Sequence, residues 1–463
     1  MFFSKSQALL ATLAAVKTAL AHTTFTEFYI DGVSNGAGTC VRMNHDGAKA
    51  SFPLEDFNSN DMACGRDGTK GVDRVCTAKA GSTITFEWHA WANDKSQIVL
   101  DPGHAGPCAV YMKKVDSAQK DTAYGDGWFK VWDMGYVDNK WCTNKMIDDN
   151  GMISIKIPNL ASGYYLIRPE LLAMHAVNSG DPQFYAGCAQ VFLESDGDLG
   201  PESTVSIPGY VKKTDESVTW NIYDKKHDNA DYPTPGPPVA HLVPGVQGAS
   251  IKANKAEGQL PEGCIIQNAN WCAFEVPEYD TETECWASQQ NCWEQQNECW
   301  DKVPPTGGAG CDVLHARCDY LNAQCAAKNW VGPPDAGKVL YHPQSTLSNV
   351  PQALPTHGGG VVAQNSIAPS AAVQTHSPSP SSSAVDNDHE QHEVAPAPSP
   401  AAAQTSAQDS PAHDAPAPTH APSAPENDNE NHDDSYDNDK NVVVVTDVVY
   451  ATQVVWQTMW VKH

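Results

Sequence analysis

Hydrophobic and polar residues alternate with a period of two in several short segments of the first half of the chain. In residues 82–90, Ile84, Phe86 and Trp88 alternate with polar residues, and three isoleucines do the same over 153–157. Because successive side chains of a strand point to opposite faces, this pattern predicts half-buried strands. Further strands are expected at 108–115, 128–134, 163–167 and 184–194. Such strands without a long helical period predict an antiparallel, immunoglobulin-like β-sandwich with long loops over residues 22–228.

Cysteines recur every seven residues in a second region, which we call the cysteine-rich module (residues 261–332). Seven residues are about two helical turns, so each trio of cysteines lines one face of a helix. Prolines and glycines at 304–310 separate the two helices. Antiparallel helices bring together residues whose numbers have a constant sum. The spacing therefore predicts a helical hairpin with three nested disulfides and a separate fourth one: Cys285–Cys325, Cys292–Cys318, Cys299–Cys311 and Cys264–Cys272.

A tryptophan follows each cysteine of the first trio: Trp286, Trp293 and Trp300. Packing of these rings against the partner helix or the preceding segment is the favoured interpretation. An exposed platform for stacking sugar rings is the alternative that the sequence leaves open.

The first 21 residues have the composition of a secretory signal peptide. Lys5 precedes an apolar run at 8–16, and Ala19-Leu20-Ala21 is a small-x-small cleavage site. Cleavage after Ala21 makes His22 the N-terminal residue of a secreted, extracellular protein. In an oxidising compartment the 14 cysteines are expected as disulfides rather than as metal thiolates.

Composition also divides the rest of the chain. Residues 229–260 are a Pro- and Gly-rich linker, and residues 333–441 are an acidic, Pro-, Ser- and Ala-rich tail that is predicted to be disordered. The last segment, 442–463, is rich in valine, but Asp447 disfavours a membrane helix. A strand that self-associates or docks onto a cell-wall or protein surface is left open.

Charge narrows the classes of partner. The chain has 56 acidic and 29 basic side chains, and its net charge of −27 argues against nucleic-acid binding.

A glycoside hydrolase would need two placed carboxylates. No motif pairs the acidic residues of 22–228 in this way.

His22, once N-terminal, offers its α-amine and its imidazole Nδ1 to one metal ion. A second imidazole would complete a T-shaped set of three nitrogens, which favours copper(II). An N-terminal histidine alone carries little weight, so this interpretation depends on residues elsewhere in the chain.

Those residues occur in order along 22–224, and together they closely resemble the fungal lytic polysaccharide monooxygenases of the cellulose-active family, formerly classed as a glycoside hydrolase family. The matching segments are His22-Thr-Thr-Phe, Thr83-Ile-Thr-Phe-Glu-Trp88, Gly103-His104-Ala-Gly-Pro107, Gly163-Tyr-Tyr-Leu-Ile-Arg168, Leu171-Leu-Ala-Met-His175 and Gln183-Phe-Tyr-Ala-Gly-Cys-Ala-Gln190.

The resemblance implies a single copper ion held by a histidine brace. His22 binds through its amine and Nδ1, His104 through its imidazole, and Tyr185 is the axial oxygen. It also implies that His175 and Gln183 orient the oxygen species by hydrogen bonds. Without the resemblance, His104 would be interpreted as a packed loop residue, and Tyr185 and His175 as residues of the core.

The resemblance extends to the substrate face and the disulfides. Tyr223 is the candidate for stacking on a glucose ring, with a structural role equally open. The family's usual disulfide corresponds to Cys64–Cys188, and the remaining four cysteines of this region are then expected to pair as Cys40–Cys76 and Cys108–Cys142.

The implied activity is copper-dependent oxidative cleavage of β-1,4-glucan, meaning cellulose and related hemicelluloses, at carbon 1, carbon 4 or both. The oxidant is hydrogen peroxide or dioxygen, and a small reductant or a secreted redox enzyme supplies electrons to a protein expected to be a monomer. The alternative is a secreted copper-binding or cell-wall-associated protein that keeps the brace but does not oxidise polysaccharide.

Overall fold

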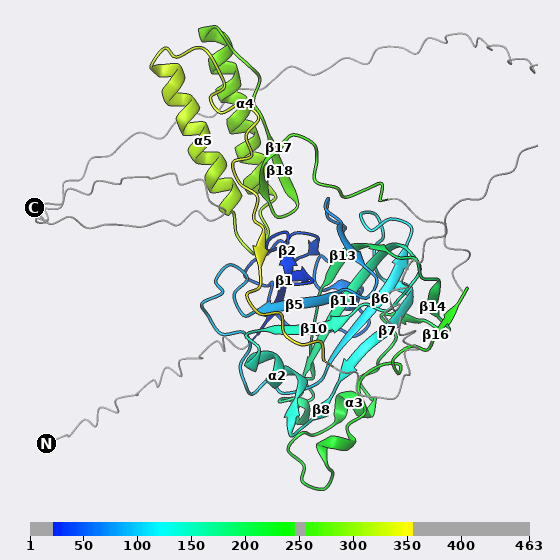
Figure 1. Cartoon of the computed structure of the whole chain (residues 1–463). Coiled ribbons are helices and arrows are strands. Elements are labelled where there is room, and N and C mark those ends of the chain that lie inside the picture. The colour runs from blue at the N-terminus through cyan, green and yellow to red at the C-terminus, as the bar shows by residue number, and fades with distance from the viewer. Residues whose placement is uncertain (1–21, 246–254, 355–463) are drawn as a thin grey trace, which may run out of the picture. The chain divides into compact units, whose positions relative to one another are not determined.

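Two β-sheets form the body of the protein in the computed structural model, which describes residues 22–245 and 255–354 (Figure 1). The smaller sheet has the strand order β10 (Met152–Lys156), β5 (Thr83–His89), β1 (Thr24–Ile30), β2 (Val33–Ser34) and β19 (Ser345–Thr346). The signal peptide, the valine-rich segment and the tail beyond residue 354 lie outside the described residues.

The larger sheet has eight strands. Its main path is β15 (Val205–Ile207), β7 (Gly125–Met134), β6 (Cys108–Val115), β11 (Gly163–Ala173), β13 (Cys188–Glu194) and β3 (Val41–Arg42). In addition, β12 (Gln183–Ala186) pairs with β11, and β4 (Cys76–Lys79) pairs with β13. Only the β4–β13 pair among these is parallel.

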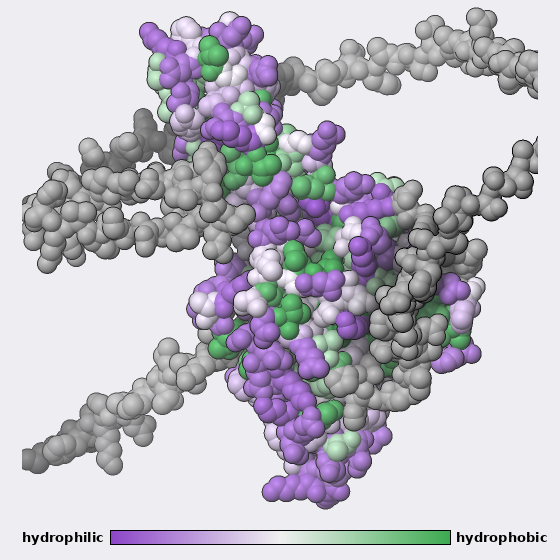
Figure 2. Space-filling view, in the orientation of Figure 1, coloured by the Kyte–Doolittle hydropathy of each residue, from purple (hydrophilic) through white to green (hydrophobic). Residues whose placement is uncertain are grey.

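The alternating residues of the two sheets supply one shared core. Phe86 and Trp88 of β5 and Met112 of β6 are fully buried there, because the period-two pattern directs every second side chain between the sheets. The predicted β-sandwich is therefore confirmed. The outer surface that Figure 2 shows is mostly polar with small scattered apolar groups, as expected for a solvated protein.

One predicted strand is interrupted. The segment 184–194 was expected to be continuous, whereas the structure divides it at Gly187 into β12 and β13. A Cβ atom at Gly187 would lie 3.1 Å from a ring carbon of Phe25, so the strand is interrupted where the backbone passes close to that ring. Period-two alternation alone does not reveal such an approach.

Short elements complete the sandwich: the β-pairs β8 (Tyr136–Val137) with β9 (Lys140–Trp141) and β14 (Leu199–Pro201) with β16 (Leu242–Pro244), and the helices α1 (Asp61–Cys64), α2 (Cys142–Asp148), α3 (Glu216–Thr219), η1 (Val177–Ser179) and η2 (Asn229–Asp231). Because β16 and η2 fall within residues 229–245, the described part of the Pro- and Gly-rich segment packs on the sandwich.

The cysteine-rich module is a helical hairpin, as predicted, with a small β-hairpin beside it. Its elements are α4 (Glu282–Asp301), α5 (Ala309–Ala326), β17 (Cys264–Asn268) and β18 (Trp271–Phe274). The Thr281 side chain accepts a hydrogen bond from the backbone N–H of Glu284 and so caps the start of α4, and the Glu284 side chain accepts one from the N–H of Asp280. No helix among the described residues is long and apolar enough to span a membrane.

Seven disulfides staple the two regions, in the pairs set out above: Cys40–Cys76, Cys64–Cys188, Cys108–Cys142, Cys264–Cys272, Cys285–Cys325, Cys292–Cys318 and Cys299–Cys311. The buried cysteines of α4 and α5 supply much of the module's core. The bonds compensate for the small apolar area that so short a region can bury.

After α5 the chain returns to the sandwich as a segment that we call the strap (residues 333–354). Its strand β19 pairs with β2, and its last described residue, Leu354, donates its backbone N–H to the carbonyl of Ser154 in β10. From composition, residues 333–354 were predicted to belong to the disordered tail, and this prediction is wrong for them. Backbone pairing on a sheet edge needs no side-chain pattern, which is why the sequence does not reveal it.

A buried charged network lies where the strap crosses the sheet. Glu87 accepts hydrogen bonds from Tyr29 and Lys95, each 2.7 Å long, and His89 Nε2 lies 2.7 Å from its other oxygen. Lys95 also bonds to Glu27, which accepts a hydrogen bond from Ser345 of the strap. Burial alone would raise the pKa of Glu87, but the bonds from His89 and Lys95 hold that pKa at about 2.

We expect Glu87→Gln to lower the free energy of unfolding near neutral pH by about 1–3 kcal/mol, because a buried charge-assisted network loses its anion. A carboxyl whose folded-state pKa is lowered from 4.5 to about 2 contributes stability above pH 4.5 and loses it as the pH falls toward 2. Denaturant unfolding across this range should show the variant converging on the wild type. Asp138→Asn, on an 84% exposed side chain, is the control, and a constant difference at all pH values would contradict the assignment.

Candidate metal and substrate site

Three histidines from separate segments meet at one edge of the sandwich and are called here the histidine cluster: His22, His104 and His175. His22 lies two residues before the first residue of β1, His104 lies in the loop before β6, and His175 follows the end of β11. The ring centroids of His22 and His104 are 6.2 Å apart, and those of His104 and His175 are 4.0 Å apart. The ring of Tyr185 on β12 lies 6.2 Å from His22 and 6.5 Å from His104.

The loop that carries His104 is clamped onto the end of β11. Leu172 N donates to the carbonyl of Pro107, and Met174 N donates to that of Ala105. A Cβ atom at Gly106 would stand 1.8 Å from the carbonyl oxygen of Leu172, so only glycine permits this approach. The backbone bonds therefore hold His104 beside His175.

The imidazole of His104 is buried without hydrogen-bond partners. Its side chain is only 5% exposed, and neither ring nitrogen is hydrogen-bonded to protein; Oδ1 of Asp101 lies 4.0 Å from Nδ1, beyond hydrogen-bond distance. The Nδ1 atom of His175 is likewise buried and unpaired. Since unsatisfied buried nitrogens are costly, their presence together points to a bound group that satisfies them.

The electrostatics of the cluster keep its imidazoles neutral. Burial, reinforced by the nearby His175, lowers the pKa of His104 to about 4. Burial also lowers the pKa of His22 and of His175. A neutral imidazole has the free lone pair that a metal ion requires.

Tyr185 and Gln183 lie on the same face of β12, two residues apart. Tyr185 Oη donates to Gln183 Oε1 at 2.9 Å, and Gln183 Nε2 donates to Asp181 at 2.8 Å. These bonds fix which end of the Gln183 amide faces the tyrosine. Burial raises the pKa of Tyr185, so its side chain stays a neutral phenol.

A small depression of about 20 Å³ adjoins the cluster at Tyr185. Thr23 and Phe52 also line it, whereas none of the three histidines does. Within the described ranges no three His, Cys, Asp or Glu side chains gather around one metal position. A metal site built from two imidazoles, one amine and one phenol needs only two side chains of these four types. The expected donor set is therefore compatible with the arrangement of His22, His104 and Tyr185.

The structure adds one aromatic neighbour that the sequence did not indicate, and it leaves one candidate apart. Phe52 is 44% exposed and lies edge-on to His22, with ring centroids 5.3 Å apart. It belongs to a loop without periodicity, so no sequence signal marks it. Tyr223, 60% exposed after α3, has no ring contact or hydrogen bond with the histidine cluster in the described part of the chain.

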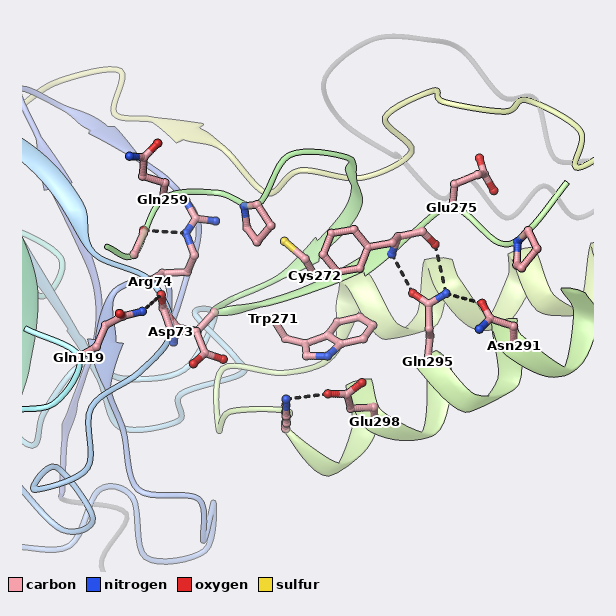
Figure 3. Close-up of a pocket in the computed structure, with 16 residues that line it drawn as sticks. Asp73, Arg74, Gln119, Gln259, Trp271, Cys272, Glu275, Asn291, Gln295 and Glu298 are labelled. Carbon is pink, nitrogen blue, oxygen red and sulfur yellow. Dashed lines mark hydrogen bonds and ion pairs between the residues drawn. The ribbon is translucent and has the colours of Figure 1, made fainter. Parts of the chain in front are cut away.

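A larger cavity of about 660 Å³ lies elsewhere, at the joint between the sandwich and the cysteine-rich module (Figure 3). Asp73, Arg74 and Gln119 line its sandwich side. On the module side, Gln295 of α4 bonds to the backbone of Phe274 in β18. None of its lining residues belongs to the histidine cluster and none is a histidine, so its size does not make it the reactive centre.

Comparisons with known proteins agree with this arrangement. The model of Auxiliary Activity family 9 (formerly GH61) matches residues 22–232. AA9 family lytic polysaccharide monooxygenase C of Aspergillus tamarii is 47% identical over 355 residues, which cover 73% of this chain and 93% of the relative. Monooxygenase H of Botryotinia fuckeliana is 44% identical over 347 residues, covering 70% and 78%.

A solved structure, that of a cellulose-active polysaccharide monooxygenase from M. thermophila, is 27% identical over 48% of this chain and all of its own length, with a TM-score of 0.41. The identity to the A. tamarii protein over nearly its whole length decides the assignment. The chain belongs to the AA9 family of lytic polysaccharide monooxygenases, copper-dependent oxidoreductases that cleave polysaccharides oxidatively.

Proposed function

We propose that this protein, exported and cleaved after Ala21, binds one copper ion and oxidises β-1,4-glucan in cellulose and related hemicelluloses at carbon 1, carbon 4 or both. The observation that carries the proposal is the His104 imidazole, which is buried with both nitrogens unpaired and faces His22 across 6.2 Å. A buried imidazole whose nitrogens make no hydrogen bond is what a metal ligand leaves when the metal is taken away.

The ligands follow from the donor atoms that meet there. His22 would bind through its α-amine and Nδ1, His104 through its imidazole and Tyr185 through its phenol oxygen. Nitrogen-rich donor sets of this kind would favour copper(II). Copper bound there supplies the one-electron chemistry by which dioxygen or hydrogen peroxide, with electrons from an external reductant, oxidises a sugar C–H bond.

The neighbouring side chains position the oxygen co-substrate. His175 stacks 4.0 Å from the His104 ring and keeps an unpaired Nδ1. Gln183 is held by Tyr185 and Asp181 at the same time, so its amide cannot rotate without breaking two bonds. Both groups offer hydrogen bonds at fixed positions beside the ligands, which limits where a reactive oxygen species can go.

The proposed substrate is a polymer, and a glucan chain at the surface of a solid has to lie across the enzyme rather than enter a pocket. Phe52, 44% exposed and edge-on to His22, offers an aromatic ring beside the proposed ligands. Tyr223, exposed on the loop after α3, remains a candidate for stacking on this chain.

We expect the mature protein, with copper and ascorbate, to release oxidised oligosaccharides from swollen cellulose. Mass spectrometry should detect aldonic acids for attack at carbon 1 and gem-diols for attack at carbon 4. His104→Ala should lower product formation by at least about a hundredfold, because a metal ligand is removed. His241→Ala, on a 66% exposed side chain, is the matched control.

Two outcomes would contradict this activity. Product release without any reductant would indicate hydrolysis. Tight copper binding without oxidised sugars from several glucans would instead indicate a secreted copper-binding protein.

A second prediction concerns the N-terminal amine. A protein that keeps one extra residue before His22 should bind copper(II) at least about a hundredfold more weakly, because an acylated nitrogen is a poor ligand. Isothermal titration measures this, with a protein tagged after His463 as the control. Equal affinity in the two proteins would exclude the α-amine as a ligand.

A further inference from the structure

The three tryptophans of α4 are not all part of the core of the cysteine-rich module. Trp286 is 37% exposed and Trp300 is 42% exposed. Trp293 between them is half-buried, and its ring lies edge-on to His315 of α5 with centroids 5.1 Å apart. The packing interpretation therefore accounts for the middle ring and leaves the outer two facing solvent.

The nested disulfides place these rings in one row. Each tryptophan follows a cysteine that is bonded to α5, so all three project from the same side of α4, at about 100° from the cysteine face. Trp300 lies against Gly308, where an added Cβ would be 2.6 Å from the indole. Gly308 and His315 are seven residues apart, the same spacing as the tryptophans. They therefore lie beside Trp300 and Trp293, one as a small neighbour and the other as a polar neighbour.

The other side of α4 is covered. Gln295 bonds to the backbone of Phe274 in β18, and Ser288 donates to the carbonyl of Pro277. The row of tryptophans is therefore the side of α4 that lies away from β18.

The spacing of the row selects a class of ligand. Successive tryptophans are two helical turns apart, which is about 10 Å along the axis. This is close to the length of one cellobiose unit, so a β-1,4-linked glucan presents an equivalent ring face at each tryptophan. Polar groups flank the middle ring, since His315 lies 3.5 Å from Asp319 and 3.4 Å from Gln296.

The charge of the module selects against anionic polymers. Residues 261–332 contain eleven acidic and three basic side chains. A polyanion such as polygalacturonate would be repelled, whereas a neutral glucan is not.

We propose that Trp286, Trp293 and Trp300 form a stacking surface for a neutral β-1,4-glucan chain, separate from the histidine cluster. The choice of glucan as ligand rests on the proposed function, since the enzyme and its module then hold the same polymer. Aromatic rings suit this role because a sugar ring stacks on them with little loss of side-chain freedom.

The test is the partition of the full-length mature protein onto microcrystalline cellulose without reductant. We expect Trp286→Ala combined with Trp300→Ala to lower the partition coefficient about tenfold or more, as loss of two aromatic contacts does at other interfaces. Trp286→Phe with Trp300→Phe should keep most of the binding. Tyr320→Ala, a 49% exposed aromatic on α5, is the matched control and should change binding by less than about twofold.

Copper affinity and circular dichroism of all variants should match those of the wild type. Equal binding by the alanine variant, no binding of the wild type to cellulose, or preferential binding to polygalacturonate would each overturn the stacking surface. If the alanine variant binds as well as wild type while the wild type still oxidises cellulose, the proposed function stands alone. If binding depends on the tryptophans but no oxidised sugars form, the stacking surface stands and the proposed function fails.

Discussion

The close approach of the His104 loop to the end of β11 is the constraint on which the site depends. The carbonyl of Leu172 occupies the space that a side chain at position 106 would need. Backbone hydrogen bonds on both sides of this point extend the β6–β11 pairing into the loop. His104 and His175 are thus held 4.0 Å apart by main-chain contacts rather than by their own side chains. For the proposed copper site this means that His104 would be preorganised, because binding would not have to order it.

The same strand also sets the opposite wall of the site. β11 pairs with β12 so that Leu171 lies across from Tyr185 and Ala173 across from Gln183. Since side chains alternate along β12, Tyr185 and Gln183 emerge on one face. One ladder therefore aligns Tyr185, Gln183 and, through the residues that follow β11, His175. His22 alone comes from the smaller sheet, just before β1.

The regular parts of the protein were predictable because regular structure leaves a period in the sequence. Alternation located β5 and β6, and the seven-residue cysteine spacing gave the register of α4 against α5. The resemblance to a known family identified the site residues. The distances between these residues could not be predicted, because loops bring them together. Three features were not predicted, and for the same reason: the division of the strand at Gly187, the position of Phe52 beside His22, and the pairing of the strap with the sandwich. Each depends on a contact between distant segments that no local pattern records.

All 14 cysteines of the chain are engaged in the seven disulfides. Thiolates are the protein groups that peroxide oxidises first, through sulfenic to irreversible sulfinic and sulfonic acids. A member of a family that turns over oxidants at its own surface has no such group to lose. The staples that hold a small helical hairpin together thus also remove the side chain through which this enzyme would most readily damage itself.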